Sequence, residues 1–261
     1  MRKLLAIIVA ALLVITAQPA AAEDLTTLWS GWWAATDVGT PFFYGISANW
    51  VQPKAICNPP NRRGVHDEYA SWVGLGAGEP GFPDWLVQIG VITSCGGVGE
   101  QNKPTYEIFW EAVDTTVANE DIMPPQHTAD LVQAGDFIGA SVTSNNQGLW
   151  SLTLDVNGKS RQKLSFTPTT EQKAKSHAGL EGVTAEAISE STKALQQWPN
   201  FGSVTFLNLQ VNTDPAKSWV PFREQTRLRT TDALTLAGQK ATKTGPLEPV
   251  NNSYTTSYVK P

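Results

Sequence analysis

The chain of 261 residues is acidic and sparsely charged: 16% of its residues are charged, 41% are hydrophobic, and the formal net charge is −5 at pH 7. No stretch concentrates Lys and Arg, so neither nucleic acid nor an anionic membrane surface is an expected partner. The two cysteines and three histidines show no spacing typical of a metal site, and we expect no metal or other cofactor. The length suits one large all-β domain or two smaller domains.

Residues 1–22 have the features of a secretory signal peptide. Two basic residues precede an apolar run over 4–15, and the three alanines at 20–22 offer a cleavage site. The run is too short to cross a membrane as a helix, and no second apolar run follows it. We therefore expect a secreted, extracellular protein without a membrane anchor, whose folded part is residues 23–261.

Cys57 and Cys95 are the two cysteines of the chain. An exported protein folds in an oxidising compartment, where two cysteines are expected to pair. In the chain-entropy account, closing a loop of this length stabilises a fold by about 4 kcal/mol. We therefore predict one structural disulfide.

The remainder of the chain consists of short apolar or aromatic segments separated by residues typical of turns. Few stretches have the 3.6-residue period of a helix, and short strands at regular spacing are typical of a β-sandwich. Residues 145–148 predict a hairpin turn. Strands are expected at 28–33, 42–51, 68–75, 85–91, 106–113, 136–143, 149–156, 162–166, 185–189, 202–211 and 253–259.

The expected sandwich is a single domain, because no linker or internal repeat divides the chain. Its core is predicted over residues 28–211. Residues 213–250 are the most polar and least patterned part, and we expect them to wrap around the surface before a closing strand ends the C-terminal portion, 213–261. A monomer is expected.

The motifs of the common hydrolases are missing from the sequence. There is no Gly-x-Ser-x-Gly segment, and no Asp-Thr-Gly or Asp-Ser-Gly turn of the aspartic proteases. The two cysteines are expected to be structural, and nothing near His66 or His127 suggests a catalytic triad. Candidate chemistry is therefore left to polar residues embedded in the predicted strands.

Gln88 is the one polar side chain in the strand predicted over 85–91. Burying an amide without a partner costs roughly 1–3 kcal/mol, so Gln88 needs either neighbouring hydrogen-bond partners or a ligand. A glutamine bonded to nearby backbone is the common outcome for such a position. The strand alone therefore leaves a structural and a functional interpretation open.

Three further candidates are glutamates in or directly after predicted strands. Glu111 belongs to the strand over 106–113, while Glu186 and Glu190 lie four residues apart near 185–190. Because alternate residues of a strand share a face, Glu186 and Glu190 are expected to point the same way. Strand carboxylates usually lie on a solvated sheet face, so each residue taken alone has a structural explanation.

Taken together, these segments resemble the glutamic peptidases, also called eqolisins. Ser-Trp-Val-Gly-Leu at 71–75 is similar to the family's Trp-Val-Gly-Ile segment, and Ala-Glu-Ala-Ile-Ser-Glu at 185–190 is similar to the segment whose second glutamate is catalytic. The resemblance implies a secreted acid protease built as two packed antiparallel sheets, a concanavalin-like jelly-roll sandwich. Further segments resemble the family in the same order, at 29–31, 50–53, 86–91, 106–111, 135–138 and 201–206.

The resemblance also implies a mechanism and a protein or peptide substrate. Glu190 would be the general base that activates water, and Gln88 would donate a hydrogen bond to the oxyanion that forms on the scissile carbonyl. The ordinary pKa of a glutamate, near 4.3, permits a base in mildly acidic medium. The residues implied to line or support the cleft are Glu111, Trp72, Trp29 and Glu186.

Two positions depart from the family pattern. Gly76 stands where the family carries an aspartate that helps to orient the catalytic pair, and Glu79 or Asp84 could replace it only if the intervening loop folds back. Ala187 stands where the family favours tryptophan, which would open space on the opposite face or alter substrate packing.

The departure at Gly76 favours an alternative hypothesis, in which the sandwich binds polysaccharide or peptide without hydrolysing it. Exposed indole rings would then serve as stacking platforms, although core packing is the commoner fate of tryptophan. The candidate tryptophans are Trp29, Trp32, Trp33, Trp72, Trp85 and Trp110.

Overall fold

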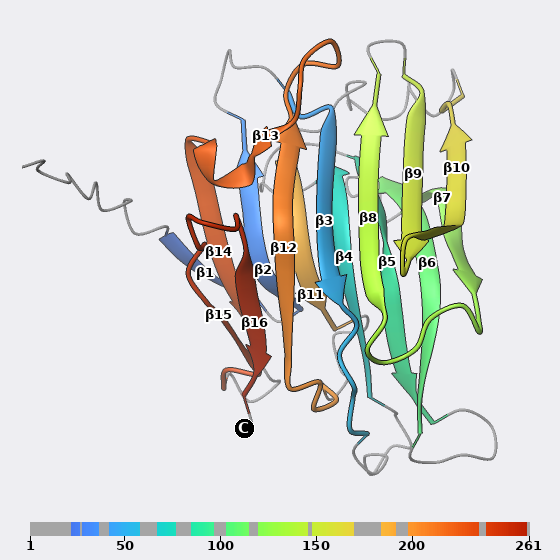
Figure 1. Ribbon diagram of the computed structural model, residues 1–261, viewed down its shortest axis with the longest axis vertical. Coiled ribbons are helices and arrows are strands. Elements are labelled where there is room, and N and C mark those ends of the chain that lie inside the picture. The colour runs from blue at the N-terminus through green and yellow to red at the C-terminus, as the bar shows by residue number, and fades with distance from the viewer. Residues whose placement is uncertain are drawn as a thin grey trace, which may run out of the picture.

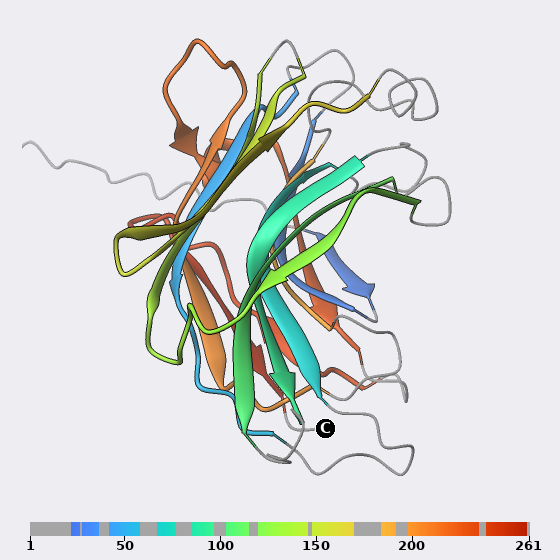
Figure 2. The same ribbon diagram turned by 90° about the vertical axis from the view of Figure 1, so that its right-hand side faces the viewer.

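The computed structural model describes most of the chain and arranges it in two layers of strands (Figures 1 and 2). Its described residues form two sheets of eight strands each, which pack face to face. This confirms the all-β sandwich expected from the sequence. The described ranges are 22–26, 28–36, 42–57, 67–76, 85–96, 103–114, 120–145, 148–169, 184–191, 198–234 and 239–259.

The first sheet carries the candidate site. Its strands, in spatial order, are β1 (Ala22–Thr26), β14 (Arg227–Ala233), β2 (Trp29–Ala35), β11 (Thr184–Glu190), β4 (Glu68–Gly76), β5 (Trp85–Cys95), β6 (Pro104–Asp114) and β7 (Glu120–Thr128). Neighbouring strands are antiparallel throughout, except that β1 and β14 run parallel.

The second sheet covers the inner face of the first (Figure 2). Its strands, in spatial order, are β10 (Lys159–Phe166), β9 (Trp150–Val156), β8 (Phe137–Ser144), β3 (Gly45–Val51), β12 (Ser203–Asn212), β16 (Tyr254–Tyr258) and β15 (Thr242–Thr244). The short strand β13 (Val220–Pro221) pairs with β12 and leads into a single helical turn, η1 (Phe222–Glu224).

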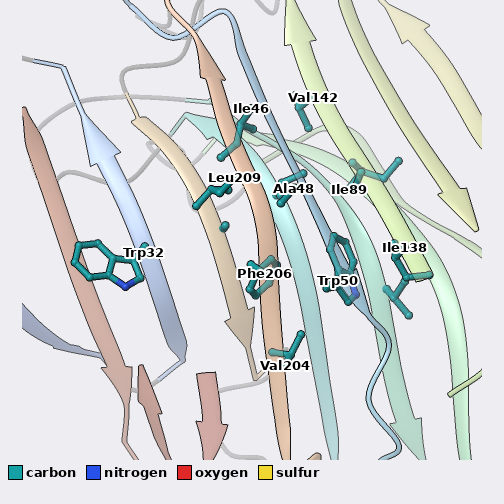
Figure 3. Close-up of a cluster of buried hydrophobic side chains, with 14 of the residues drawn as sticks. Trp32, Ile46, Ala48, Trp50, Ile89, Ile138, Val142, Val204, Phe206 and Leu209 are labelled. Carbon is teal, nitrogen blue, oxygen red and sulfur yellow. The ribbon is translucent and has the colours of Figure 1, made fainter. Parts of the chain in front are cut away.

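The main hydrophobic core lies between the two sheets (Figure 3). Strands β8 and β9 show the expected alternation of buried and half-exposed residues, because only one face of the second sheet meets the core. Trp50 and Phe206 of the second sheet are fully buried, with ring centroids 5.4 Å apart. Burial of an aliphatic or phenyl side chain in such a core contributes roughly 1.5–3 kcal/mol.

Strands β4 and β11 are instead buried on both faces. One face contributes Val73 and Ala187 to the main core. The other face contributes Trp72 and Ile188 to a second, smaller apolar cluster on the outer side of the first sheet. This double burial explains the near-continuous apolar sequence of these strands, and the outer cluster forms the surroundings of the candidate site.

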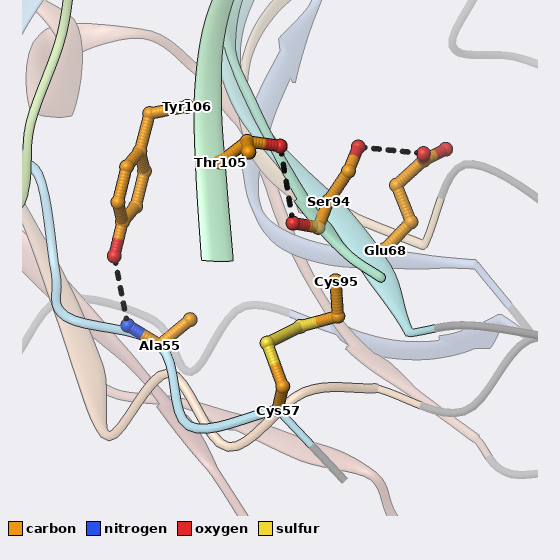
Figure 4. Close-up of a disulfide and its surroundings, with 7 residues drawn as sticks. All are labelled: Ala55, Cys57, Glu68, Ser94, Cys95, Thr105 and Tyr106. Carbon is orange, nitrogen blue, oxygen red and sulfur yellow. Dashed lines mark hydrogen bonds between the residues drawn. A yellow bond between two sulfur atoms is a disulfide. The ribbon is translucent and has the colours of Figure 1, made fainter. Parts of the chain in front are cut away.

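The predicted disulfide between Cys57 and Cys95 is present (Figure 4). It ties the end of β5 to the segment that follows β3, across a sequence separation of 38 residues. Nearby, the Tyr106 hydroxyl accepts a hydrogen bond from the Ala55 backbone N–H at 3.2 Å, and Ser94 Oγ donates to Glu68 at 2.7 Å. The disulfide and these bonds hold the ends of β4, β5 and β6 together.

Replacing both cysteines by serine is expected to lower the free energy of unfolding by about 4 kcal/mol, because the unfolded chain regains the entropy of a loop of this length. Guanidinium denaturation of the oxidised wild type and of the double variant measures the difference. Reduced wild type is the matched control and should unfold at the same midpoint as the variant. A midpoint unchanged by either treatment would contradict a stabilising role.

Several parts of the fold differ from the sequence-based expectation; among them, β1 was not expected and β10 begins at Lys159 and not at residue 162. The strand predicted over 85–91 extends to Cys95, because its later residues continue the pairing with both neighbours. β7 was not expected, since it contains two prolines, but it lies at the sheet edge, where a missing N–H donor is tolerated. The segment 213–250 does not merely wrap the surface: it supplies β13, β14 and β15.

Other expectations concern parts of the chain that are described incompletely. The predicted signal peptide lies outside the described residues apart from Ala22, which begins β1. The hairpin predicted at 145–148 is described at its two ends, where the Gly148 N–H donates to the Asn145 carbonyl at 3.0 Å. Within the described part of the chain, no helix is long and apolar enough to cross a membrane.

Candidate active site

A pocket of about 400 Å³ lies on the outer face of the first sheet. Strand alternation places its residues on the side opposite the main core, since Val87 and Ile89 face inward while Gln88 faces outward. Strands β4, β5, β6, β7 and β11 all contribute to its walls. The lining residues are Glu68, Ala70, Gln88, Ile92, Ser94, Glu107, Phe109, Glu111, His127 and Glu190.

Gln88 and Glu111 meet because they are directly opposite each other in the β5–β6 pair. Gln88 Nε2 donates a hydrogen bond to Glu111 Oε1, which supplies the partner that a buried amide requires. The Gln88 side chain is only 4% exposed, and its Oε1 is buried without a hydrogen-bond partner among the described residues. The amide is therefore fixed on one side and unsatisfied on the other.

Glu190 ends β11 and is held by two indole rings. Trp72 Nε1 donates to Glu190 Oε2 at 2.9 Å, and the Trp29 side chain also hydrogen-bonds to this carboxyl group. The two rings pack edge to face, with centroids 5.3 Å apart. The register explains the arrangement, because Glu190 pairs with Trp29 on β2 and with Ala70 on β4, two residues before Trp72.

Burial raises the pKa of Glu190 from 4.5 to about 7. The hydrogen bonds from Trp29 and Trp72 oppose this rise by stabilising the charged form, whereas the negative charge of Glu111 adds to it. The surroundings of Glu190 therefore move its pKa upward from the ordinary value of a glutamate. A strongly shifted carboxyl group in a pocket is typical of a functional site.

Glu186 lies elsewhere, although strand alternation correctly placed it on the same face as Glu190. It is fully buried and is not among the residues that line the pocket. Its Oε1 accepts a hydrogen bond from Thr184 Oγ1 at 2.6 Å. This position suits a structural group within the first sheet, and not a group that contacts substrate.

Several residues that line the pocket were not predicted from the sequence as site residues. Glu107 and His127 face each other across the β6–β7 pair, with His127 Nδ1 3.4 Å from Glu107 Oε2. Glu107 could have been found, because it is four residues before Glu111 and therefore shares its face. His127 could not, because its place depends on β7, which the sequence did not predict. Glu68 was recognised only as the start of a strand.

The two departures from the family pattern are both buried but lie on different strands of the first sheet. Gly76 is buried at the end of β4 opposite Thr184, with a φ of 136°, a backbone conformation that favours glycine. Its suggested substitutes, Glu79 and Asp84, lie outside the described residues. Ala187 faces the main core and not the pocket, and its carbonyl accepts a hydrogen bond from the Tyr254 hydroxyl.

The tryptophans whose side chains the structure describes do not form the exposed platforms of the alternative hypothesis. Trp32 and Trp33 are less than 10% exposed, and Trp72 is fully buried. Trp29 and Trp110 are partly buried, and the side chain of Trp85 lies outside the described part of the structure. The described indole rings pack against neighbouring side chains, and those of Trp29 and Trp72 also hydrogen-bond to Glu190.

Comparisons with known proteins agree with this architecture. The family model described as the peptidase A4 family matches residues 27–245. No curated protein matches the chain in sequence. Two crystal structures of scytalido-glutamic peptidase share the fold. In both comparisons the match covers 90% of this chain and 100% of the scytalido-glutamic peptidase chain. One contains a transition state analogue inhibitor (TM-score 0.63, 18% identity) and the other a peptide-based transition state analogue (TM-score 0.60, 19% identity).

SCP-B, a member of the eqolisin family in complex with the tripeptide Ala-Ile-His, is also similar, with a TM-score of 0.60 and 18% identity over 90% of this chain and 100% of that chain. At these sequence identities, the structural similarity is evidence for a shared fold alone. The family assignment rests on the sequence model, which spans most of the chain. The chain therefore belongs to the peptidase A4 family, the glutamic peptidases or eqolisins.

Proposed function

We propose that this protein is a secreted endopeptidase that hydrolyses peptide bonds with Glu190 as general base and Gln88 as oxyanion donor. The observation that carries the proposal is that both side chains, from strands far apart in the sequence, line one pocket. The proposed substrate is a protein or peptide, in keeping with the peptide ligands of the structural relatives. No step of the proposed reaction needs a metal or a cofactor.

The proposed reaction begins when the ionised Glu190 carboxylate takes a proton from water. The water oxygen attacks the scissile carbonyl carbon, and negative charge develops on the carbonyl oxygen. A primary amide has two N–H groups; Gln88 gives one to Glu111, which leaves the other for the oxyanion. Glu190 then returns the proton to the leaving amine as the C–N bond breaks, which regenerates the carboxylate.

Glu111 and the two indoles have supporting roles in this proposal. Glu111 fixes the amide of Gln88 by accepting its hydrogen bond, so that the amide cannot rotate freely. Trp72 and Trp29 fix the carboxyl group of Glu190 and stabilise its charged form. Such preorganisation matters because donors that are already aligned need not be reoriented when charge develops.

The pH dependence should report the pKa of Glu190. Because a base must be ionised, kcat/KM is expected to rise tenfold per pH unit below about 7 and to level off above it. The enzyme should therefore be active at a higher pH than it would be if Glu190 had the ordinary pKa of a glutamate. Initial rates of cleavage of a quenched fluorescent peptide between pH 3 and 9 measure the profile. A maximum in acid with a decline near pH 7 would instead assign activity to the protonated carboxyl group.

The basic test is digestion of a denatured protein by the purified chain beginning at residue 23, followed by mass spectrometry of the fragments. We expect internal cleavages that pepstatin does not inhibit, because the chain lacks the aspartic-protease turns. N-terminal sequencing of the protein exported from its host tests the proposed removal of residues 1–22. Intact substrate at every pH, with tryptophan fluorescence changes on peptide addition, would favour a binding protein.

A further inference from the structure

The indole ring of Trp72 spans the distance between Glu190 and Gly74. At one corner, Nε1 donates to Glu190 Oε2 at 2.9 Å. At the opposite corner, Cζ3 lies so close to Gly74 that a Cβ atom added there would be 2.8 Å away. Carbon atoms in favourable contact are about 3.5–4.0 Å apart, so the ring occupies the space that a side chain at position 74 would need.

Gly74 also lies beside the proposed oxyanion donor. It is directly opposite Gln88 in the β4–β5 pair, and an added Cβ would be 3.3 Å from Gln88 Cβ and 3.1 Å from Leu86 Cδ1. Gly74 is not among the glycines with a positive φ, so its backbone conformation is open to other residues. The physical reason for glycine at this position is therefore the lack of room for a side chain, and not the backbone conformation.

Trp72 has little freedom to move away from an added atom. Its side chain is fully buried, and Trp29 packs against it edge to face. On the adjacent strand, a Cβ at Gly90 would be 2.6 Å from Trp72 Cβ, which shows how closely the β5 backbone approaches. A side chain at position 74 would therefore displace or tilt the ring, and Nε1 would move with it.

We infer that Gly74 is a positioning residue of the active site: its missing side chain lets the Trp72 ring lie where Nε1 holds the carboxyl group of Glu190 in the pocket that Gln88 also lines. Gly74 touches no reacting atom and acts through Trp72. The inference deepens the proposed function, because the group that Gly74 positions through Trp72 is the proposed base. Its first consequence, the placement of the Glu190 carboxyl group, can be measured without any catalytic activity.

The first experiment follows the Glu190 carboxyl carbon by NMR titration of ¹³C-glutamate-labelled protein, with the signal assigned by its loss in Glu190→Gln. A hydrogen bond to a carboxylate stabilises its charged form, so losing the indole donor should raise the pKa of Glu190 by about one in Gly74→Ala. The matched control is Gly139→Ala on the second sheet, where an added Cβ meets only the movable Asn49 side chain below 3.4 Å. An unchanged pKa in Gly74→Ala would overturn the inference.

The second experiment is a double-mutant cycle with Trp72→Phe, which removes both Nε1 and the far edge of the ring. Gly74→Ala should lower kcat about tenfold or more in the wild-type background, with little change in KM, yet change it less than twofold in the Trp72→Phe background. Equal losses in both backgrounds would show that Gly74 does not act through Trp72. Because the phenyl ring leaves room, the double variant should fold even if Gly74→Ala does not.

The two experiments separate this inference from the proposed function. If wild type cleaves no peptide, the proposed peptidase activity fails, while the NMR titration still decides whether Gly74 positions the carboxyl group. If wild type cleaves peptide and both the pKa of Glu190 and kcat are the same in Gly74→Ala, the peptidase stands and the role of Gly74 is rejected.

Discussion

Replacing Glu190 by glutamine should lower kcat/KM for peptide cleavage by about 10²–10⁴, the usual contribution of a general base. The change removes the proton acceptor but keeps the shape of the side chain, and the amide oxygen can still accept the hydrogen bond from Trp72 Nε1. KM should therefore change little, and the loss should appear in kcat. Steady-state rates with a quenched fluorescent peptide at pH 8, where wild-type Glu190 with its pKa of about 7 is largely ionised, measure the effect.

Glu224→Gln is the matched control for this experiment. Glu224 is an exposed glutamate of η1 and does not line the pocket, so the same loss of one charge should leave both kinetic constants within twofold of wild type. Equal cleavage rates for wild type and Glu190→Gln would show that the base is another group. Thermal unfolding of all three proteins establishes that the comparison is between folded molecules.

Replacing Gln88 by leucine should lower kcat by about 10²–10³, the typical loss when one oxyanion donor is removed. Leucine is close to glutamine in size and suits an apolar strand, so packing should survive better than with alanine. Its carboxylate partner, Glu111, loses a hydrogen bond in this variant, so a modest loss of stability is also expected. Rates at saturating peptide isolate kcat from any change in peptide binding.

Gln210→Leu on the outer face of β12 is the corresponding control, because it makes the same exchange on an exposed strand position of the other sheet. The double variant of Gln88 and Glu190 adds a sharper criterion. When two residues act in one step, the losses caused by replacing them do not multiply. The kcat of the double variant should therefore be within a few fold of the kcat of Glu190→Gln alone. Fully multiplied losses would indicate that the two residues serve separate steps.

The local setting of each site residue could be predicted from the sequence. Gln88 was expected in an apolar strand, and Glu111 and Glu190 were expected on strand faces together with apolar neighbours. These expectations depend on the two-residue period of a β-strand, which is a property of a few consecutive residues. The disulfide followed similarly from the cysteine count and the expected compartment.

Two strands show where such local patterns fail. β7 is an edge strand that contains two prolines, and β14 is largely polar, with a burial that does not alternate along the strand. Both are strands because a neighbouring strand offers them unpaired backbone groups. His127 consequently lines the pocket from a segment that was not predicted as a strand from the sequence.

The sequence by itself determined the class of fold, the segment that carries each candidate residue and which neighbours share a face with the glutamates. Only the tertiary structure decided which strands are neighbours. β11 lies between β2 and β4, and this brings Glu190 to Trp72 across 118 residues of sequence. The raised pKa of Glu190 follows from that placement, because desolvation depends on atoms from several distant segments that surround one carboxyl group. No short sequence pattern encodes such an environment.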